Sequence, residues 1–160
     1  MIYEKRIHQL KRKVLIPAPL NEVFDFFSRA ENLNLITPKW LNFKILEPSP
    51  KEMKKGAYIN YSLKLYGIRI SWKTEITLWD PPQAFVDEQI QGPYPLWIHH
   101  HMFQEKNDNT IMEDIVKYSV PGGFIEPLIQ TFFVQHRLKK IFDYREQMLL
   151  KIFDSRSNNG

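Results

Sequence analysis

The feature that most constrains this chain is a change in the spacing of its apolar residues near residue 121. Between residues 56 and 120, apolar and polar residues alternate over several short segments, as they do in strands with one buried face. After Pro121-Gly122-Gly123, apolar residues recur with the period of an amphipathic helix. A series of strands followed by one long helix predicts an α+β fold, in which the helix covers the apolar face of an antiparallel sheet.

The two central strands are predicted together with their pairing. Residues 56–65 and 68–78 both alternate, and Tyr66-Gly67 between them suits a two-residue hairpin turn. This turn places Leu65 opposite Ile68, so that the apolar faces of the two strands coincide. Further strands are predicted over residues 6–16, 43–47, 84–90, 96–105 and 110–120.

Helical patterns flank the strands. A short helix is predicted over 19–28, because Pro19 suits a first helical turn and apolar residues follow at helical spacing. A second short helix is predicted over 32–36, and a long one over 126–153, about 40 Å at 1.5 Å per residue. No linker rich in Gly or Ser divides the chain. We therefore expect a single domain over residues 1–153 and a disordered tail over 154–160.

Composition excludes several classes of function. The chain has no cysteine, which excludes disulfides, thiolate metal sites and cysteine nucleophiles. Its apolar runs are short and its first residues lack the apolar core of a signal peptide, so we expect a cytoplasmic protein without membrane insertion. The net charge is only +4 and the basic residues are dispersed among acidic ones, so no binding of nucleic acid is predicted.

The segment 96–105 contains the most promising polar side chains. Alternation places Trp97, His99, His101 and Phe103 on one face, so that two imidazoles lie between two aromatic rings. With a loop over residues 106–109, His101 lies opposite Asp114 and Trp97 lies opposite Tyr118. Two imidazoles, a carboxylate and a phenol among aromatic rings are typical of a pocket that orients a small molecule.

Several roles for this group remain open. Asp114 could simply hydrogen-bond His101 and stiffen the sheet, or the imidazoles and Tyr118 could bind the polar end of a ligand. In a catalytic role, His101 oriented by Asp114 would be a general base that removes a proton next to a carbonyl group. His99, His101 and Asp114 could also hold Zn²⁺, but Asp114 would then have to leave the histidine that it orients. No metal site and no cofactor are therefore predicted.

Other candidates lie on the predicted sheet and near its ends. Tyr61, Leu63 and Trp72 from the sheet, with Phe132 from the helix, either belong to the core or line a cavity. Trp40 and Phe43 follow Pro38 in a segment that could gate such a cavity. The pattern does not assign Asp87 to either face of its strand.

Four segments resemble the START-like superfamily of helix-grip proteins, also called SRPBCC, which includes polyketide cyclases and dehydrases. They are IPAPLNEVFDFFSRAENLNLITP, GPYPLWIHHHMF, NTIMEDIVKYSVPGG and IFDYR, and the resemblance covers roughly residues 5–153. It is strongest to a small bacterial branch of ligand-binding proteins. The resemblance implies a curved antiparallel sheet of six or seven strands around a long C-terminal helix, with two short helices after the first strand. It also implies a deep apolar cavity between sheet and helix.

The residues and the resemblance together suggest the binding of an apolar or amphipathic small molecule of lipid, polyketide or quinone type. The alternative is a cyclase, dehydratase or isomerase that uses His101 and Asp114, so whether the chain is an enzyme stays open. The expected partner is the small molecule alone. We expect a monomer or a weak homodimer, because an exposed edge strand would permit pairing.

Overall fold

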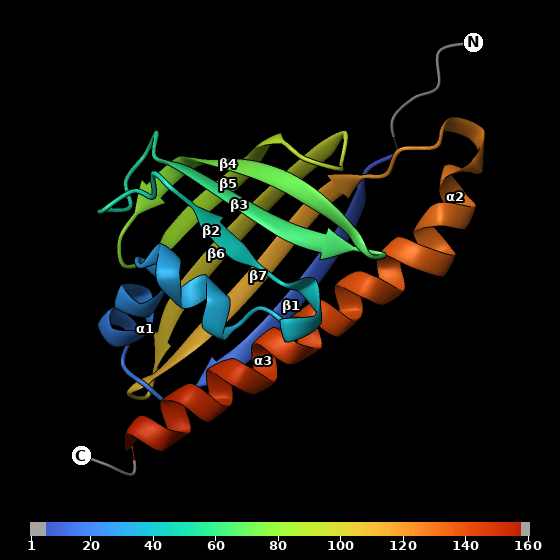
Figure 1. Ribbon diagram of the computed structural model, residues 1–160. Coiled ribbons are helices and arrows are strands. Elements are labelled where there is room, and N and C mark those ends of the chain that lie inside the picture. Colours follow the sequence, from blue (N-terminus) through green and yellow to red (C-terminus); the bar gives the residue numbers. More distant parts are fainter. Residues whose placement is uncertain (1–5, 158–160) are drawn as a thin grey trace.

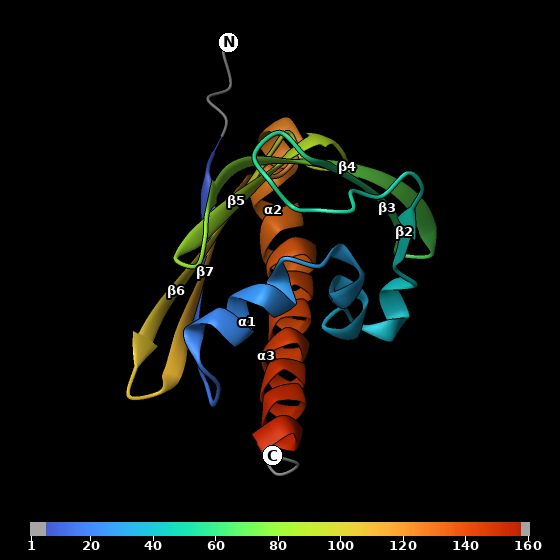
Figure 2. The same ribbon diagram turned by 90° about the vertical axis from the view of Figure 1, so that its left-hand side faces the viewer.

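The computed structural model describes residues 6–157 and contains a seven-stranded antiparallel sheet that curves around one long helix (Figure 1). The strands lie in the order β1-β7-β6-β5-β4-β3-β2. Their bounds are β1 His8–Ile16, β2 Lys44–Leu46, β3 Tyr58–Leu65, β4 Ile68–Asp80, β5 Ala84–Gln91, β6 Leu96–Lys106 and β7 Asn109–Ser119. The helix lies on the concave side of the sheet (Figure 2). The predicted helix-grip α+β fold is confirmed.

The hairpin registers also agree with the sequence prediction. Leu65 pairs with Ile68 across a turn in which Tyr66 and Gly67 both have positive φ, the conformation of a tight two-residue hairpin turn. In the second hairpin, His101 pairs with Asp114 as predicted. Its turn is tighter than the predicted loop over residues 106–109, because the ladder continues as far as the pair Lys106–Asn109.

The apolar face of β4 ends earlier than the alternation predicts. The pairing of β4 with β5 shifts between Ile76 and Leu78, so the strand contains an irregularity there. Leu78, predicted to face inward, is 44% exposed. Trp79 takes the inward position instead and packs against Phe24 and Phe85. A bulge of this kind re-aims the side chains that follow it.

The first helices close one end of the curved sheet. α1 spans Leu20–Phe27, and two short 3₁₀ helices follow, η1 Ala30–Leu35 and η2 Lys39–Leu41. Phe24 and Phe27 of α1 pack on Phe103 of β6, while Phe26 packs on Phe153 near the end of the long helix. This end of the space between sheet and helix is therefore solidly filled.

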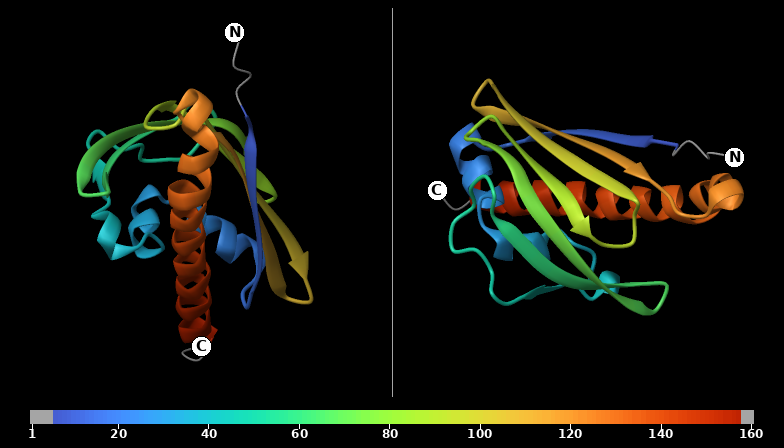
Figure 3. Two further views of the ribbon diagram at one scale, coloured as in Figure 1. Left: turned by 90° about the vertical axis from the view of Figure 1, so that its right-hand side faces the viewer. Right: turned by 90° about the horizontal axis from the view of Figure 1, so that it is seen from above.

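The C-terminal helix is longer and less regular than predicted. It begins with η3 Gly123–Ile125 and α2 Glu126–Ile129, passes through the π-helical turn η4 Gln130–Val134, and continues as α3 Gln135–Ser157 (Figure 3). Residues 154–157, expected in a disordered tail, are thus helical, and residues 158–160 lie outside the described part. Within the described residues, no helix is both long and apolar enough to cross a membrane.

Candidate functional site

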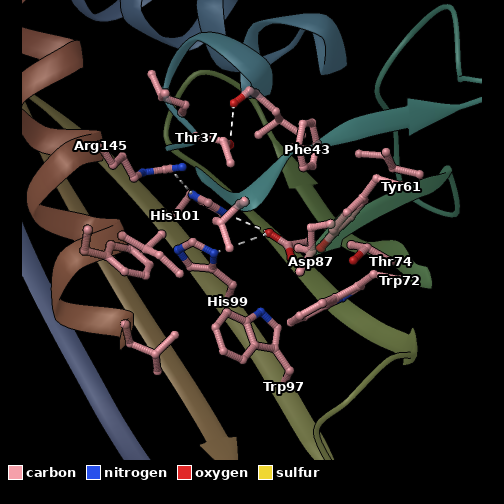
Figure 4. Close-up of a pocket in the computed structure, with 18 of the residues that line it drawn as sticks. Thr37, Phe43, Tyr61, Trp72, Thr74, Asp87, Trp97, His99, His101 and Arg145 are labelled. Atoms are coloured by element: carbon pink, nitrogen blue, oxygen red, sulfur yellow. Dashed lines mark hydrogen bonds and ion pairs between the residues drawn. The ribbon is translucent and has the colours of Figure 1, made fainter. Parts of the chain in front are cut away.

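A cavity of about 180 Å³ lies between the concave face of the sheet and α3, beyond the end filled by α1. Its lining comes from the sheet, from α3 and from the segment that includes η1 and η2. Most of the lining is apolar or aromatic, and one wall has polar side chains (Figure 4). The apolar part includes Leu33, Ile36, Leu41, Ile59, Ile76, Leu138, Ile141 and Phe142.

The cavity contains most, but not all, of the residues predicted to bind a ligand. Those that line it are Tyr61, Leu63, Trp72, Trp97, His99 and His101. Phe103 is instead buried in the core beneath α1. Tyr118 belongs to a separate buried cluster, where its hydroxyl accepts a hydrogen bond from Gln130 at 2.8 Å. Asp114 is buried as well, but it contacts the histidines from outside the cavity.

Phe132, which was also predicted as a ligand contact, does not line the cavity. Its side chain is 68% exposed. The inward positions of this part of the helix are Gln130, which is buried, and Val134, which packs against the core. Phe132 lies two residues from each of them, about half a helical turn away, and so it faces outward.

The two gate candidates lie at different depths. Phe43 lines the cavity, and its ring packs against that of Tyr61 with centroids 5.1 Å apart. Trp40 is 45% exposed and is not part of the lining. The guanidinium of Arg137, which does line the cavity, lies 4.7 Å from the Trp40 ring and 4.3 Å from the Tyr66 ring. Arg137 thus connects α3 to both segments at this side of the cavity by cation–π contacts.

The polar wall belongs to a buried network of charged and imidazole groups from four elements, β5, β6, β7 and α3. Asp114 on β7 accepts hydrogen bonds from Arg145 on α3, with Nε 3.2 Å from Oδ2 and Nη2 3.3 Å from Oδ1. His99 on β6 donates from Nε2 to Oδ1 of the same carboxylate at 2.9 Å. Burial raises the pKa of Asp114, but the charge of Arg145 and the hydrogen bonds from the histidines outweigh it and hold this pKa well below its usual value.

His101 lies between two carboxylates. Its Nε2 is 2.7 Å from Oδ2 of Asp87 on β5, and its Nδ1 is 3.0 Å from Oδ1 of Asp114. Burial lowers the pKa of His101, but the hydrogen bonds to Asp114 and Asp87 outweigh it and raise this pKa above its usual value. Each ring nitrogen therefore faces a carboxylate oxygen, and Arg145 Nη2 also lies 3.3 Å from Nδ1, so both nitrogens already have partners. This geometry does not suit the predicted role of His101 as a general base.

The pKa of the neighbouring His99 is shifted in the opposite direction. Burial and the charge of His101 lower the pKa of His99 to about 4, although its hydrogen bond to Asp114 opposes this change. Because the two imidazole centroids are 3.7 Å apart, protonating both rings would be unfavourable. At neutral pH His99 is uncharged, and its Nδ1 lies 3.8 Å from Oδ2 of Asp87.

Further polar groups, on β3 and β4, line the cavity beside Asp87. Trp72 Nε1 is buried and has no hydrogen-bond partner among the described residues. Thr74 Oγ1 is also buried, and it makes no hydrogen bond of ordinary geometry with the described residues. The Thr74 hydroxyl is nevertheless close to Tyr61 and slightly lowers the pKa of Tyr61. Burial is the larger effect and raises the pKa of Tyr61, so its hydroxyl stays protonated. Trp72 thus lines the cavity and carries an N–H that has no partner among the described residues.

Sequence reasoning missed Asp87 and Arg145. The irregular pairing of β4 with β5 leaves the face of Asp87 unassigned by alternation, yet Asp87 pairs with His99 in the neighbouring strand. Arg145 could have been found, because it lies seven residues after Leu138 and three after Phe142, on the buried stripe of α3. A charged residue on such a stripe indicates a buried charged partner.

The comparisons with known proteins agree with this architecture. Residues 16–145 match the family described as polyketide cyclase / dehydrase and lipid transport. The chain belongs to the polyketide cyclase/dehydrase family. This confirms the predicted membership of the START-like superfamily. No curated protein matches the chain in sequence.

Several solved structures share the fold of this polyketide cyclase/dehydrase family member. The Zhui aromatase/cyclase from Streptomyces sp. R1128 has a TM-score of 0.74 at 13% identity, covering 95% of this chain and 96% of that chain. Protein CV1439 from Chromobacterium violaceum has a TM-score of 0.71 at 11% identity, covering 91% and 97%. A norcoclaurine synthase point mutant from Thalictrum flavum has a TM-score of 0.65 at 12% identity, covering 92% and 97%. Family and fold support ligand binding or cyclase-like chemistry in an apolar cavity.

Proposed function

We propose that this protein binds a small, largely apolar molecule with one or two rings and an acceptor oxygen. The cavity volume of about 180 Å³ supports a ligand of this size, since an apolar cavity of about 150 Å³ is enough to bind benzene. Among the predicted ligand classes, compact quinone-like or polyketide-like rings suit this volume better than a long lipid chain.

The observation that carries the proposal is the unpartnered N–H of Trp72 at the wall of an apolar cavity. A buried donor without a partner costs about 1–3 kcal/mol. A ligand oxygen that accepts from Trp72 Nε1 would remove this cost, while its rings bury apolar surface against the sheet and α3. The donor thus favours ketones, quinones and phenols over plain hydrocarbons.

A matched pair of ligands tests this proposal. We expect 1-tetralone, a two-ring ketone, to bind more tightly than tetralin, which has the same rings without the oxygen, and calorimetry measures both. One hydrogen bond of about 1 kcal/mol corresponds to roughly a fivefold preference. The variant Trp72→Phe should bind both ligands equally. Failure of both to bind, or an unchanged preference in Trp72→Phe, would contradict the proposal.

Catalysis is a second candidate, supported by the position of Asp87. Its carboxylate lines the cavity, and its pKa lies below the usual value because the hydrogen bond from His101 and the nearby charges outweigh burial. An ionised carboxylate beside a bound ketone can remove a proton from the carbon next to the carbonyl group, the first step of an aldol cyclisation or an isomerisation.

Exchange of the α-protons of 1-tetralone in deuterated water tests the catalytic candidate without knowledge of the natural product. We expect the wild-type protein to accelerate the exchange and Asp87→Asn to abolish the acceleration. His100→Gln is the matched control, because His100 lies on the opposite face of β6 and does not line the cavity. Exchange no faster than in buffer alone would exclude this role for Asp87.

A further inference from the structure

Three side chains at the polar wall bring their ligand atoms close together. Asp87, His99 and His101 offer one carboxylate oxygen and two imidazole nitrogens, all within 4.8 Å of one another. His101 Nε2 is 2.7 Å from Asp87 Oδ2, and His99 Nδ1 is 3.8 Å from the same oxygen (Figure 4). Ligands at about 2.0–2.1 Å from a tetrahedral metal ion lie about 3.4 Å apart. The two distances lie on either side of this value.

The far side of each imidazole is already held in the way that a metal site requires. His99 Nε2 and His101 Nδ1 lie 2.9 Å and 3.0 Å from the same atom, Oδ1 of Asp114. Histidines that bind metals commonly donate their second N–H to a carboxylate, which fixes the tautomer and the ring orientation. Asp114 thereby directs the other nitrogen of each ring toward Asp87. Arg145 in turn fixes Asp114 and neutralises its charge.

This arrangement removes the objection to a metal site that the sequence alone raises. There, Asp114 was the only carboxylate available as a metal ligand, and it could not also orient His101. In the structure, Asp87 supplies the anionic ligand from the neighbouring strand, and Asp114 keeps its orienting role. Three ligands from two adjacent strands leave the remaining coordination positions for molecules in the cavity, which all three side chains line.

We propose that Asp87, His99 and His101 bind a divalent transition-metal ion of the Zn²⁺, Fe²⁺ or Co²⁺ class. Two imidazoles and one carboxylate favour such ions over Ca²⁺ and Mg²⁺, which prefer oxygen ligands. The inference goes beyond the proposed function, because it depends only on the side chains and not on the identity of the organic ligand. In the competing interpretation, the three residues are only a hydrogen-bonded cluster that keeps its proton between His101 and Asp87.

Cobalt(II) is a suitable probe because its visible absorption reports nitrogen and oxygen coordination directly. The full chain, first treated with EDTA and dialysed, is titrated with CoCl₂, and Zn²⁺ affinity is obtained by displacement. We expect one equivalent of Co²⁺ to bind and Zn²⁺ to displace it, while Ca²⁺ and Mg²⁺ do not compete. Absence of stoichiometric Co²⁺ and Zn²⁺ binding to the folded wild-type protein would overturn the proposal, whether or not 1-tetralone binds.

Variants locate the ion. Asp87→Asn and His99→Gln each remove one ligand, and we expect each to weaken binding at least 100-fold. Asp114→Asn changes only the orienting group, and a loss of about 10–100-fold is expected. The matched control is His100→Gln, which should bind as the wild type does. Near-UV circular dichroism checks that each variant is folded, and His99→Gln decides the matter if Asp87→Asn does not fold. Binding that survives both ligand substitutions, or that His100→Gln abolishes, would place the ion elsewhere and overturn the proposal.

Discussion

The buried, uncharged state of His99 predicts a specific dependence of stability on pH in the metal-free protein. Its pKa falls from 6.5 to about 4 on folding, because burial and the charge of His101 disfavour the protonated ring. Between these two values the unfolded chain binds a proton that the folded protein does not. Stability must therefore fall as the pH falls from about 6.5 toward 4.

The size of this loss of stability follows from the change in the pKa of His99 on folding. Integrating the difference in bound protons for one group gives a loss of about 2 kcal/mol between pH 6.5 and pH 4.5. His101 adds little over this range, because its pKa is raised and it is protonated in both states below 6.5. Asp87 and Asp114 have lowered pKa values, so their contributions are lost mainly below pH 4.5.

Urea unfolding at several pH values, in the presence of EDTA, measures this dependence. The variant His99→Gln keeps a donor for Asp114 but cannot bind a proton, so it should lose most of the decrease in unfolding free energy. His100→Gln should keep most of the decrease, since the pKa of the less buried His100 is also lowered but by weaker effects. Equal pH dependence in the wild type and His99→Gln would refute the reasoning.

Three further predictions concern packing and charge. Phe24→Ala, which opens a cavity beneath α1, should destabilise the protein by about 3–5 kcal/mol in urea unfolding. Arg145→Met leaves the carboxylate of Asp114 buried without the guanidinium of Arg145 and should also cost about 3–5 kcal/mol of unfolding free energy. Arg137→Met loses only partly exposed cation–π contacts and should cost about 1 kcal/mol or less. Equal costs for the two variants would contradict the account. Ile141→Trp should fill the cavity, leave the protein folded by circular dichroism and abolish the binding of 1-tetralone, and retained affinity would mean that the ketone binds elsewhere.

The sequence predicts the parts of the fold that follow from regular spacing. Alternation and a loop over residues 106–109 are enough to predict the register of the β6–β7 hairpin, in which a slip by one residue would turn His99 and His101 away from the core. The histidine wall was therefore predictable in its place and its direction, as was the contact between His101 and Asp114.

The irregular parts of the chain were not predictable in this way. The shifted pairing near Ile76 exposes Leu78, and the irregular ladder beside β5 hides the direction of Asp87, because a bulge has no periodic signature. Phe132 was misplaced because it lies in a π-helical turn, off the buried stripe that α3 continues. The raised pKa of His101 depends on both Asp87 and Asp114, and the sequence pattern places only Asp114 next to His101.

A crystal structure of the protein with 1-tetralone at saturating concentration tests the central claim most directly. We expect the ketone to lie between the sheet and α3, with its oxygen within hydrogen-bonding distance of Trp72 Nε1. A cavity that contains no ketone under these conditions, or a ketone bound only on the outer surface, would contradict the account.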